Sequence, residues 1–317
     1  MTAAPLDAIA IGRIGVDLYP EQHRVALADV ETFVKGLGGS AANVAVAAAR
    51  HGRRSALVTK VGDDGWGAYC RRALADYGVD ARWVGTDPAL RTPVTFCEVH
   101  PPDDFPLLFY REPTAPDLSV SEDELDLDAI AAAGLLWTTG TGLSREPSRS
   151  AVLAALDARA GRDGRRALAV HDLDDRPMLW PAGERHEDWA QEAVKRATVV
   201  VGNRAEAAVA VGDLPPREQA LALLELGPEI AIVKQGPAGV LGATRSGEIV
   251  EVPPTPVEVV CGLGAGDAFG GALCHGLLAG WPLERILRFA NVAGAIVASR
   301  LLCAAAMPTS EEVEARL

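Results

Sequence analysis

Along most of this chain, short apolar runs alternate with stretches of helical periodicity, and glycine often ends a segment. Residues 6–11 form an apolar run that ends at Gly12, and residues 40–51 form a small, apolar helical stretch that Gly52 ends. Repeated strand-then-helix order favours a parallel sheet, because parallel strands need crossover helices, which then cover both faces of the sheet. The pattern therefore predicts an α/β fold with a central, mostly parallel sheet flanked by helices.

The remaining predicted elements follow the same rhythm. Strands are predicted at 55–61, 135–139, 167–170, 198–201 and 230–233, and helices at 66–77, 148–160, 186–197, 265–278 and 283–301. In such sheets ligands bind beyond the carboxyl ends of the strands. We therefore expect a single active-site edge.

Two stretches, 14–37 and 91–112, break this rhythm with prolines, aromatic residues and β-branched residues. Within the second, runs 94–99 and 107–110 flank a Pro-Pro-Asp-Asp turn, which is typical of antiparallel strands. We interpret both stretches as strands of a small lid, inserted in one domain that spans residues 1–317. Ordinary surface loops are the alternative.

Charge and composition limit the partners. The formal net charge is −13, and no Lys/Arg run reaches five residues. Nucleic acid and anionic membrane surfaces attract basic patches, so neither is an expected partner. No uncharged apolar run reaches the ~20 residues of a membrane helix, and no signal peptide is recognisable. Five cysteines without a CxxC pair indicate reduced thiols, and the predicted location is the cytoplasm.

The segment 262–271, Gly-Leu-Gly-Ala-Gly-Asp-Ala-Phe-Gly-Gly, carries the clearest chemistry. The small residues Gly264, Ala265 and Gly266 let backbone N–H groups approach a ligand, and the helix that starts here adds unpaired donors and partial positive charge. Such a turn suits phosphate. Asp267, in the first helical turn, could accept a proton from a substrate hydroxyl that attacks a γ-phosphate. The alternative is that Asp267 only complements the helix dipole.

A second glycine-rich element, 36–43, opens the first long helix. Gly38 and Gly39 would let a ligand lie against the backbone, and Asn43 offers a donor and an acceptor to sugar hydroxyls. A tight turn before the helix is the alternative. The chain has neither a GxxxxGK[ST] loop nor a GxGxxG after the first strand, so a nicotinamide-dependent dehydrogenase is not supported.

Together these two elements resemble the N-terminal and C-terminal signatures of the PfkB, or ribokinase-like, carbohydrate kinases. Further resemblances fall between and after them in the family's order: Gly-Asp-Asp at 62–64 with Gly67, Asn203 to Glu206, Lys234 to Gly239, and Asn291. The resemblance covers essentially the whole chain and implies a ribokinase-like fold with ATP and Mg²⁺. Asp267 would be the catalytic base, and the turn at Gly264, Ala265 and Gly266 would hold the phosphoryl group.

The resemblance also implies roles for the remaining motif residues. Asn203 and Glu206 would reach Mg²⁺, through water. The nucleotide site would be formed by Asn203, Lys234, Gly236, Gly239, Gly264, Gly266 and Asn291. The sugar site would be formed by Asp17, Gly38, Gly39, Asn43, Arg111, Arg176 and Asp267.

Within the family, segments 12–19, 101–112 and 172–180 resemble the 5-dehydro-2-deoxygluconokinases of inositol catabolism, and the last two also resemble 2-keto-3-deoxygluconate kinases. Both branches act on a keto sugar acid. A carboxylate is matched by the planar fork of an arginine, and Arg111 and Arg176 stand where those kinases carry arginines. The alternatives are an ion pair of Arg111 with Glu112 and a turn aspartate at Asp17.

One departure from the family pattern concerns the residues before the turn formed by Gly264, Ala265 and Gly266, which we call the anion turn. Relatives often carry Asp-Thr there, which helps bind a stimulatory monovalent cation, whereas this chain has Cys261 and Gly262. We expect no such cation site and read Cys261 as a buried filler. Two other functions stay open: a kinase for a neutral sugar such as fructose or ribose, and a non-catalytic regulator that binds a sugar acid. A homodimer through the lid is also predicted.

Overall fold

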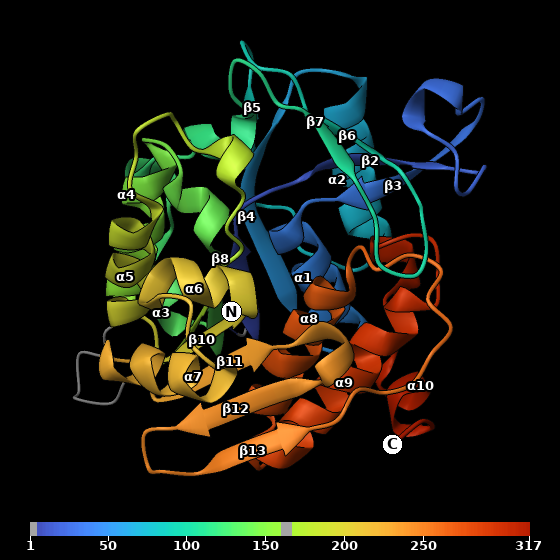
Figure 1. The fold of residues 1–317 in the computed structure, drawn as a ribbon. Helices are drawn as coiled ribbons and strands as arrows, with labels where there is room; N and C mark the ends of the chain where they lie inside the picture. The colour runs from blue at the N-terminus through green and yellow to red at the C-terminus, as the bar shows by residue number, and fades with distance from the viewer. Residues whose placement is uncertain (1–4, 160–166) are drawn as a thin grey trace.

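The computed structural model describes residues 5–159 and 167–317 (Figure 1). Its main sheet, within those residues, has nine strands in the order β13-β12-β11-β10-β9-β8-β1-β4-β5. The strands are β1 (Ala8–Ile11), β4 (Ser55–Gly62), β5 (Val84–Asp87), β8 (Leu135–Thr139), β9 (Leu168–Asp172), β10 (Val199–Asn203), β11 (Ile230–Lys234), β12 (Val240–Thr244) and β13 (Ile249–Val252). Every pair from β11 to β5 is parallel, and the two pairs at the other edge, β11–β12 and β12–β13, are antiparallel. The predicted mostly parallel sheet is confirmed.

Helices cover both faces of this sheet. One face carries α1 (Ser40–Arg50), α2 (Gly65–Asp76), α8 (Ala265–Leu278) and α9 (Leu283–Ala298), with α10 (Ser310–Glu314) behind them; the other carries α3 (Leu127–Ala132), α4 (Ser148–Ala158), α5 (His186–Arg196), α6 (Arg204–Val211) and α7 (Pro216–Glu225) (Figure 1). Side chains of β1 alternate between the two layers: Ala8 and Ala10 join one core, Ile9 and Ile11 the other. Two buried faces explain why this strand reads as a continuous apolar run.

The predicted helices and strands recur with small shifts at their ends. The last long helix ends at Ala298 rather than at residue 301, and residue 160, the predicted end of another helix, lies outside the described residues. The sequence analysis did not predict strands β5, β12 and β13, or helices α3, α6, α7 and α10. Short 3₁₀ turns cover Leu27–Asp29, Pro116–Ser119, Glu122–Glu124, Gly140–Leu143, Pro177–Leu179, Gly236–Ala238 and Ala304–Ala306.

A separate four-stranded sheet comes from the two irregular stretches. Its order is β3-β2-β6-β7, with β2 (Gly15–Pro20), β3 (Phe33–Gly38), β6 (Val94–Cys97) and β7 (Leu107–Tyr110). The predicted antiparallel pair is present as β6 and β7, and β2 and β6 are parallel. This small sheet lies beside α1 and α8 in Figure 1. Among the described helices, none combines the length and apolar character needed to cross a bilayer.

Candidate active site

A cavity of about 990 Å³ lies between the small sheet, the first turns of α1 and α8, and the carboxyl ends of β9, β10 and β11. This size suits a small-molecule site. Strand residues at alternate positions of the small sheet face it: Gly15, Asp17, Thr95, Cys97, Leu107 and Phe109. All the predicted site residues line the cavity except Gly38. The expected active-site edge therefore brings together residues from both ends of the chain.

Asp267 is joined to the other signature element by a direct contact. Asn43 Nδ2 donates a 2.8 Å hydrogen bond to Asp267 Oδ2. Loss of solvation raises the pKa of Asp267 to about 6, although the Asn43 hydrogen bond and the charges of Arg13 and Lys234 lower it. A carboxyl group with a pKa near neutrality is suited to general-base catalysis, because it is both ionised and able to accept a proton at neutral pH.

The turn before α8 leaves backbone donors free. Gly264 caps the helix in the left-handed conformation, with φ of 81°, and no side chain caps the helix. Ala265 N–H makes a long turn contact of 3.4 Å to Gly262 O, while no hydrogen-bond partner among the described residues is found for the N–H groups of Gly266 and Asp267. These two donors, at the positive end of the helix dipole, form an anion site beside the Asp267 carboxylate.

Asp17 approaches the cavity from the small sheet. Its carboxylate packs over the backbone of β3, where a Cβ on Gly38 would lie 2.1 Å from Asp17 Oδ1. Gly38 therefore leaves room for the Asp17 carboxylate, and it does not itself line the cavity. The Tyr19 hydroxyl donates toward Asp17 Oδ2 at 3.2 Å. Loss of solvation raises the pKa of Asp17 to about 6.

Arg111 is buried in the cavity wall at the end of β7. Its Nη2 forms an ion pair of 2.5 Å with Asp117 Oδ1, so the predicted alternative, a surface pair with Glu112, is wrong. Asp117 also accepts from Ile14 N at 3.3 Å, which fixes it to the start of the small sheet. Arg111 Nε is buried without a hydrogen-bond partner among the described residues. That nitrogen has almost no accessible surface, so other atoms of Arg111 form its part of the cavity wall.

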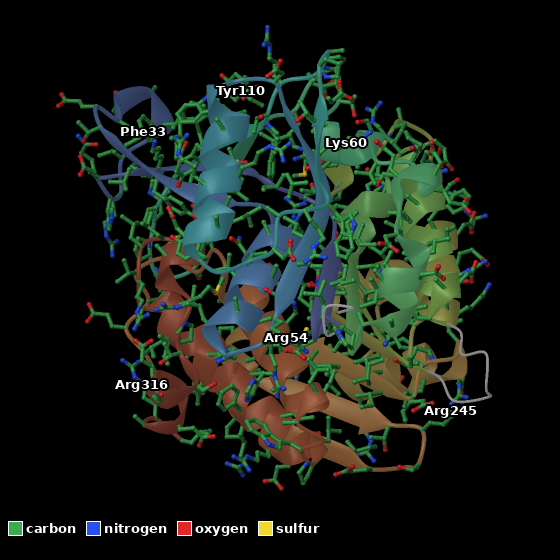
Figure 2. The ribbon with its side chains drawn as sticks, turned by 180° about the vertical axis from the view of Figure 1, so that it is seen from behind. Phe33, Arg54, Lys60, Tyr110, Arg245 and Arg316 are labelled. Atoms are coloured by element: carbon green, nitrogen blue, oxygen red, sulfur yellow. The ribbon has the colours of Figure 1, made fainter. Side chains whose placement is uncertain are left out.

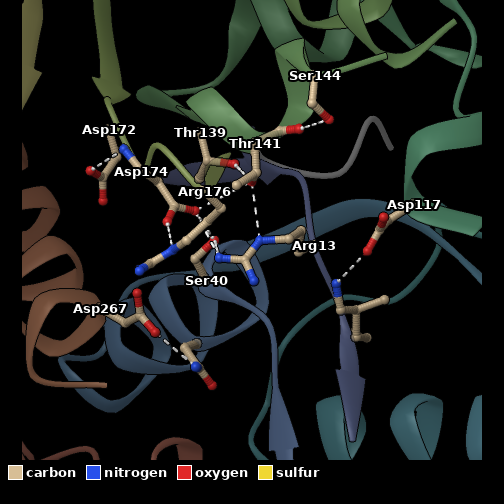
Figure 3. A network of polar contacts seen from close by, with 12 residues as sticks. Arg13, Ser40, Asp117, Thr139, Thr141, Ser144, Asp172, Asp174, Arg176 and Asp267 are labelled. Carbon is tan, nitrogen blue, oxygen red and sulfur yellow. Dashed lines mark hydrogen bonds and ion pairs between the residues drawn. The ribbon is translucent and has the colours of Figure 1, made fainter. Parts of the chain in front are cut away.

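A buried network that the sequence analysis did not predict lies beyond β9 (Figure 3). Asp174 accepts from Arg13 Nη2 at 2.9 Å, Ser40 Oγ at 2.8 Å and Arg176 Nε at 3.0 Å. Burial opposes ionisation, but the charges of Arg13 and Arg176 hold the pKa of Asp174 well below its usual range. Arg13, a charged residue two positions after a buried strand, is the sequence signal that could have revealed this network.

Lys234 stands at the end of β11 between carboxylates and the anion turn. Its Nζ lies 3.9 Å from Asp172 Oδ1, and a Cβ on Gly266 would lie 3.3 Å from the same Nζ. Burial disfavours the charge of Lys234, but Asp172 and Glu206 outweigh it and raise its pKa. Loss of solvation raises the pKa of Asp172 to about 7. Lys234 is therefore a cation held at the anion turn.

Asn203 and Glu206 form a capping box at the start of α6. Asn203 Oδ1 accepts from Glu206 N at 2.9 Å, and Glu206 Oε2 accepts from Asn203 N at 2.7 Å. Both residues line the cavity, and Glu206 Oε1 has no hydrogen bond within the described residues. One carboxylate oxygen therefore remains for a hard cation or its water, which is the oxygen chemistry that Mg²⁺ prefers.

The remaining predicted nucleotide residues surround the far end of the cavity. Gly236 and Gly239 border a 3₁₀ turn after β11, and a Cβ on Gly236 would meet nothing within 4 Å. Asn291 on α9 donates from Nδ2 to Pro253 O at 2.7 Å, which ties the loop after β13 to the helix.

All five cysteines are buried free thiols. Cys261 is fully buried, and loss of solvation raises its pKa to about 11, which keeps the thiol neutral. Cys303 packs against the anion turn, where a Cβ on Gly264 would lie 2.6 Å from its Sγ. These positions fit the predicted filler role of Cys261.

Comparison with known proteins identifies the family of this chain. The sequence model of the pfkB family of carbohydrate kinases matches residues 6–310. The 5-dehydro-2-deoxygluconokinase of Geobacillus kaustophilus (strain HTA426) is 34% identical over 315 residues, which are 98% of this chain and 93% of that protein.

Solved structures agree on the fold. A PfkB protein from Polaromonas sp. JS666 superposes with a TM-score of 0.84 at 25% identity, over 98% of this chain and 99% of the other. An uncharacterized sugar kinase from Pyrococcus horikoshii, in complex with ATP, superposes with a TM-score of 0.80 at 26% identity, over 98% of this chain and all of the other. The ribokinase-like fold is confirmed, and the chain belongs to the pfkB family of carbohydrate kinases.

Proposed function

We propose that this protein transfers the γ-phosphoryl group of ATP to the terminal hydroxyl of a keto sugar acid, with 5-dehydro-2-deoxygluconate as the first candidate. One observation carries the proposal: the Asp267 carboxylate stands beside free backbone donors at the start of α8 and is held by Asn43 at 2.8 Å. A base and an anion site in contact are what hydroxyl phosphorylation requires.

In the proposed reaction the substrate hydroxyl loses its proton to Asp267 as its oxygen forms a bond to the γ-phosphorus. The bond from that phosphorus to the bridging oxygen breaks, and its electron pair leaves with ADP. The N–H groups of Gly266 and Asp267 would donate to the phosphoryl oxygens, and Lys234 would add a positive charge beside them.

ATP is the expected co-substrate and Mg²⁺ the expected cofactor, which would neutralise charge on the phosphates when bound. Glu206 Oε1 and the Asn203 side chain would hold the ion through water. The described residues contain no cluster of three or more metal-ligating side chains, which fits an ion held mainly by phosphates and water. Gly236, Gly239 and Asn291 would border the nucleotide.

Two features support an acidic sugar. The relative from G. kaustophilus is named 5-dehydro-2-deoxygluconokinase, and Arg111 places a buried cation in the cavity wall. Asp17 and Asn43 would bind sugar hydroxyls, and Arg176, the more exposed of the two arginines that pair with Asp174, would be the second arginine for the substrate carboxylate. A neutral sugar such as fructose is the second candidate, because the anion turn alone does not select the acceptor.

We also propose that the small sheet acts as a lid and as a dimer surface. Leu108 and Tyr110 on β7 are 46% and 61% exposed, on the side opposite the cavity-facing Leu107 and Phe109. Figure 2 labels Tyr110 and Phe33 at the periphery of this sheet. Sedimentation of the intact protein tests the dimer, and Tyr110→Glu should shift it toward monomer.

The deciding experiment is a coupled ATPase assay over a panel of acceptors: 5-dehydro-2-deoxygluconate, 2-keto-3-deoxygluconate, fructose and ribose. The proposal expects the highest kcat/KM for the first. Turnover of neutral sugars alone would contradict the sugar-acid assignment. No acceptor-dependent ATP turnover, with binding of sugar acid retained, would favour a non-catalytic regulator.

A further inference from the structure

Arg13 is a buried cation in the cavity wall to which the proposed reaction gives no task. It is 7% exposed and lies two residues after the end of β1. Its Nε donates to Thr141 Oγ1 at 3.1 Å, and its Nη2 donates to Ser40 Oγ at 3.1 Å and Asp174 Oδ2 at 2.9 Å (Figure 3). These contacts fix the plane of the guanidinium. The third nitrogen, Nη1, has no hydrogen-bond partner among the described residues.

The first turn of α1 connects Arg13 with Asp267. Ser40 contacts Arg13, and Asn43, three residues later, contacts Asp267. Side chains three positions apart on a helix are neighbours, about 5–6 Å apart at Cβ. The charge of Arg13 is also one of the influences that lower the pKa of Asp267. Arg13 and Asp267 therefore line the same cavity from neighbouring positions, so a substrate hydroxyl at Asp267 would bring its adjoining carbon toward Arg13.

The pattern of occupied nitrogens decides what Arg13 can bind. Since Nε and Nη2 are both engaged, the guanidinium cannot offer the two parallel N–H donors that grip a carboxylate. Its charge is also compensated by Asp174 at 2.9 Å. Only Nη1 remains to donate to a ligand, and a single donor on a compensated cation suits a neutral oxygen atom of the substrate. Because arginine only donates, a carbonyl oxygen, which only accepts, is its best partner.

We propose that Arg13 binds the carbonyl oxygen on the carbon next to the phosphorylated hydroxyl and thereby selects 5-keto acids. The inference rests on the proposed function. In 5-dehydro-2-deoxygluconate the carbonyl carbon adjoins the carbon that bears the terminal hydroxyl, whereas in 2-keto-3-deoxygluconate it lies at the carboxylate end. An N–H donated to that carbonyl draws electron density from the neighbouring hydroxyl and eases proton transfer to Asp267.

The test compares two acceptors that differ only at carbon 5: 5-dehydro-2-deoxygluconate, with a carbonyl, and 2-deoxygluconate, with a hydroxyl. The kcat/KM of each is measured for the unaltered protein, Arg13→Lys, and the double variant Arg13→Gln with Asp174→Asn, which avoids an unpaired buried carboxylate. We expect the double variant to lose about 100-fold or more on the keto acid and at most about 10-fold on the hydroxy acid, since a site built around one hydrogen bond discriminates by such factors. Arg13→Lys should recover part of the preference.

Thr141→Val is the matched variant, because it removes the contact to Nε and a 3.3 Å hydrogen bond from Thr141 Oγ1 to Asp174 Oδ2 but leaves the Arg13–Asp174 pair. It should reduce the keto preference several-fold with unchanged ATP affinity, and some loss of thermal stability is expected because a buried donor loses its partner. Equal losses on both acceptors in the Arg13 variants would overturn the role of Arg13. If those variants do not fold, an unchanged preference in Thr141→Val would overturn it. Either result would leave the kinase assignment standing. Failure of the unaltered protein to bind or phosphorylate the keto acid would overturn both.

Discussion

Asn43 and Asp267 are 224 positions apart in the sequence, and a 2.8 Å hydrogen bond from Nδ2 to Oδ2 joins them. Each stands in the first turn of its own helix, α1 or α8, and these helices pack against each other. The packing of two small-residue helices therefore sets the geometry of the candidate base.

Asp267→Asn removes the proton acceptor and keeps an oxygen for Asn43. We expect kcat to fall at least about 1,000-fold with ATP affinity nearly unchanged, since general-base catalysis contributes factors of this order. Steady-state kinetics and nucleotide titration check this. Asp213→Asn, an exposed residue outside the cavity, is the control. Near-normal turnover in Asp267→Asn would contradict the role of Asp267.

The same change should stabilise the protein without ligands. A carboxyl group whose pKa is raised in the folded state gives stability at low pH and loses it as pH rises from about 4 through about 6. At pH 7.5 the asparagine variant should therefore gain about 1–2 kcal/mol in free energy of unfolding. This range is smaller than the full pKa shift would give, because water in the cavity screens the charge of Asp267. Urea unfolding at pH 7.5 and at pH 3.5 measures it, and the gain should vanish at the lower pH.

The activity profile should report the raised pKa of Asp267. Because the base must be ionised, kcat/KM should fall as the pH drops below about 6. Asn43→Ala removes the hydrogen bond that favours the ionised form, so its midpoint should move to higher pH. A profile set by an ordinary carboxyl group, with its midpoint near 4, would argue against Asp267 as the base.

Arg111 should control affinity for the acid group of the substrate. We expect Arg111→Gln, combined with Asp117→Asn to avoid a buried unpaired carboxylate, to raise KM for the sugar acid about 10- to 100-fold, since hydrogen bonds to charged groups contribute about 1.5–3 kcal/mol. Kinetics with a neutral sugar provide the comparison. An equal change for both substrates would assign Arg111 to the structure of the small sheet instead.

The anion turn should not tolerate a side chain at its cap. Gly264→Ala places a Cβ 2.6 Å from Cys303 Sγ at a φ of 81° and should lower kcat at least about 100-fold. Gly280→Ala is the matched control, since Gly280 also has positive φ, 66°, but has nothing within 4 Å of the new Cβ. Similar kinetics in both variants would mean that strain alone, and not the shape of the turn, matters.

Much of the architecture could be predicted from the sequence. Buried parallel strands must be apolar on both faces, so runs such as 135–139 could be recognised, and the glycine turn before α8 marked its start at Ala265. The edge hairpin β12–β13 was missed, because its short strands surround a Thr-Arg-Ser-Gly turn that reads equally as a loop.

The sequence by itself determined the sheet type, the anion turn and the identity of the acid and amide that would act there, because local patterning and glycine turns specify them. Only the tertiary structure decided that Arg111 pairs with Asp117 and that Arg13, Asp174 and Arg176 form one network. Partners of buried charges are chosen by packing between segments distant in the chain, and no local spacing records that choice.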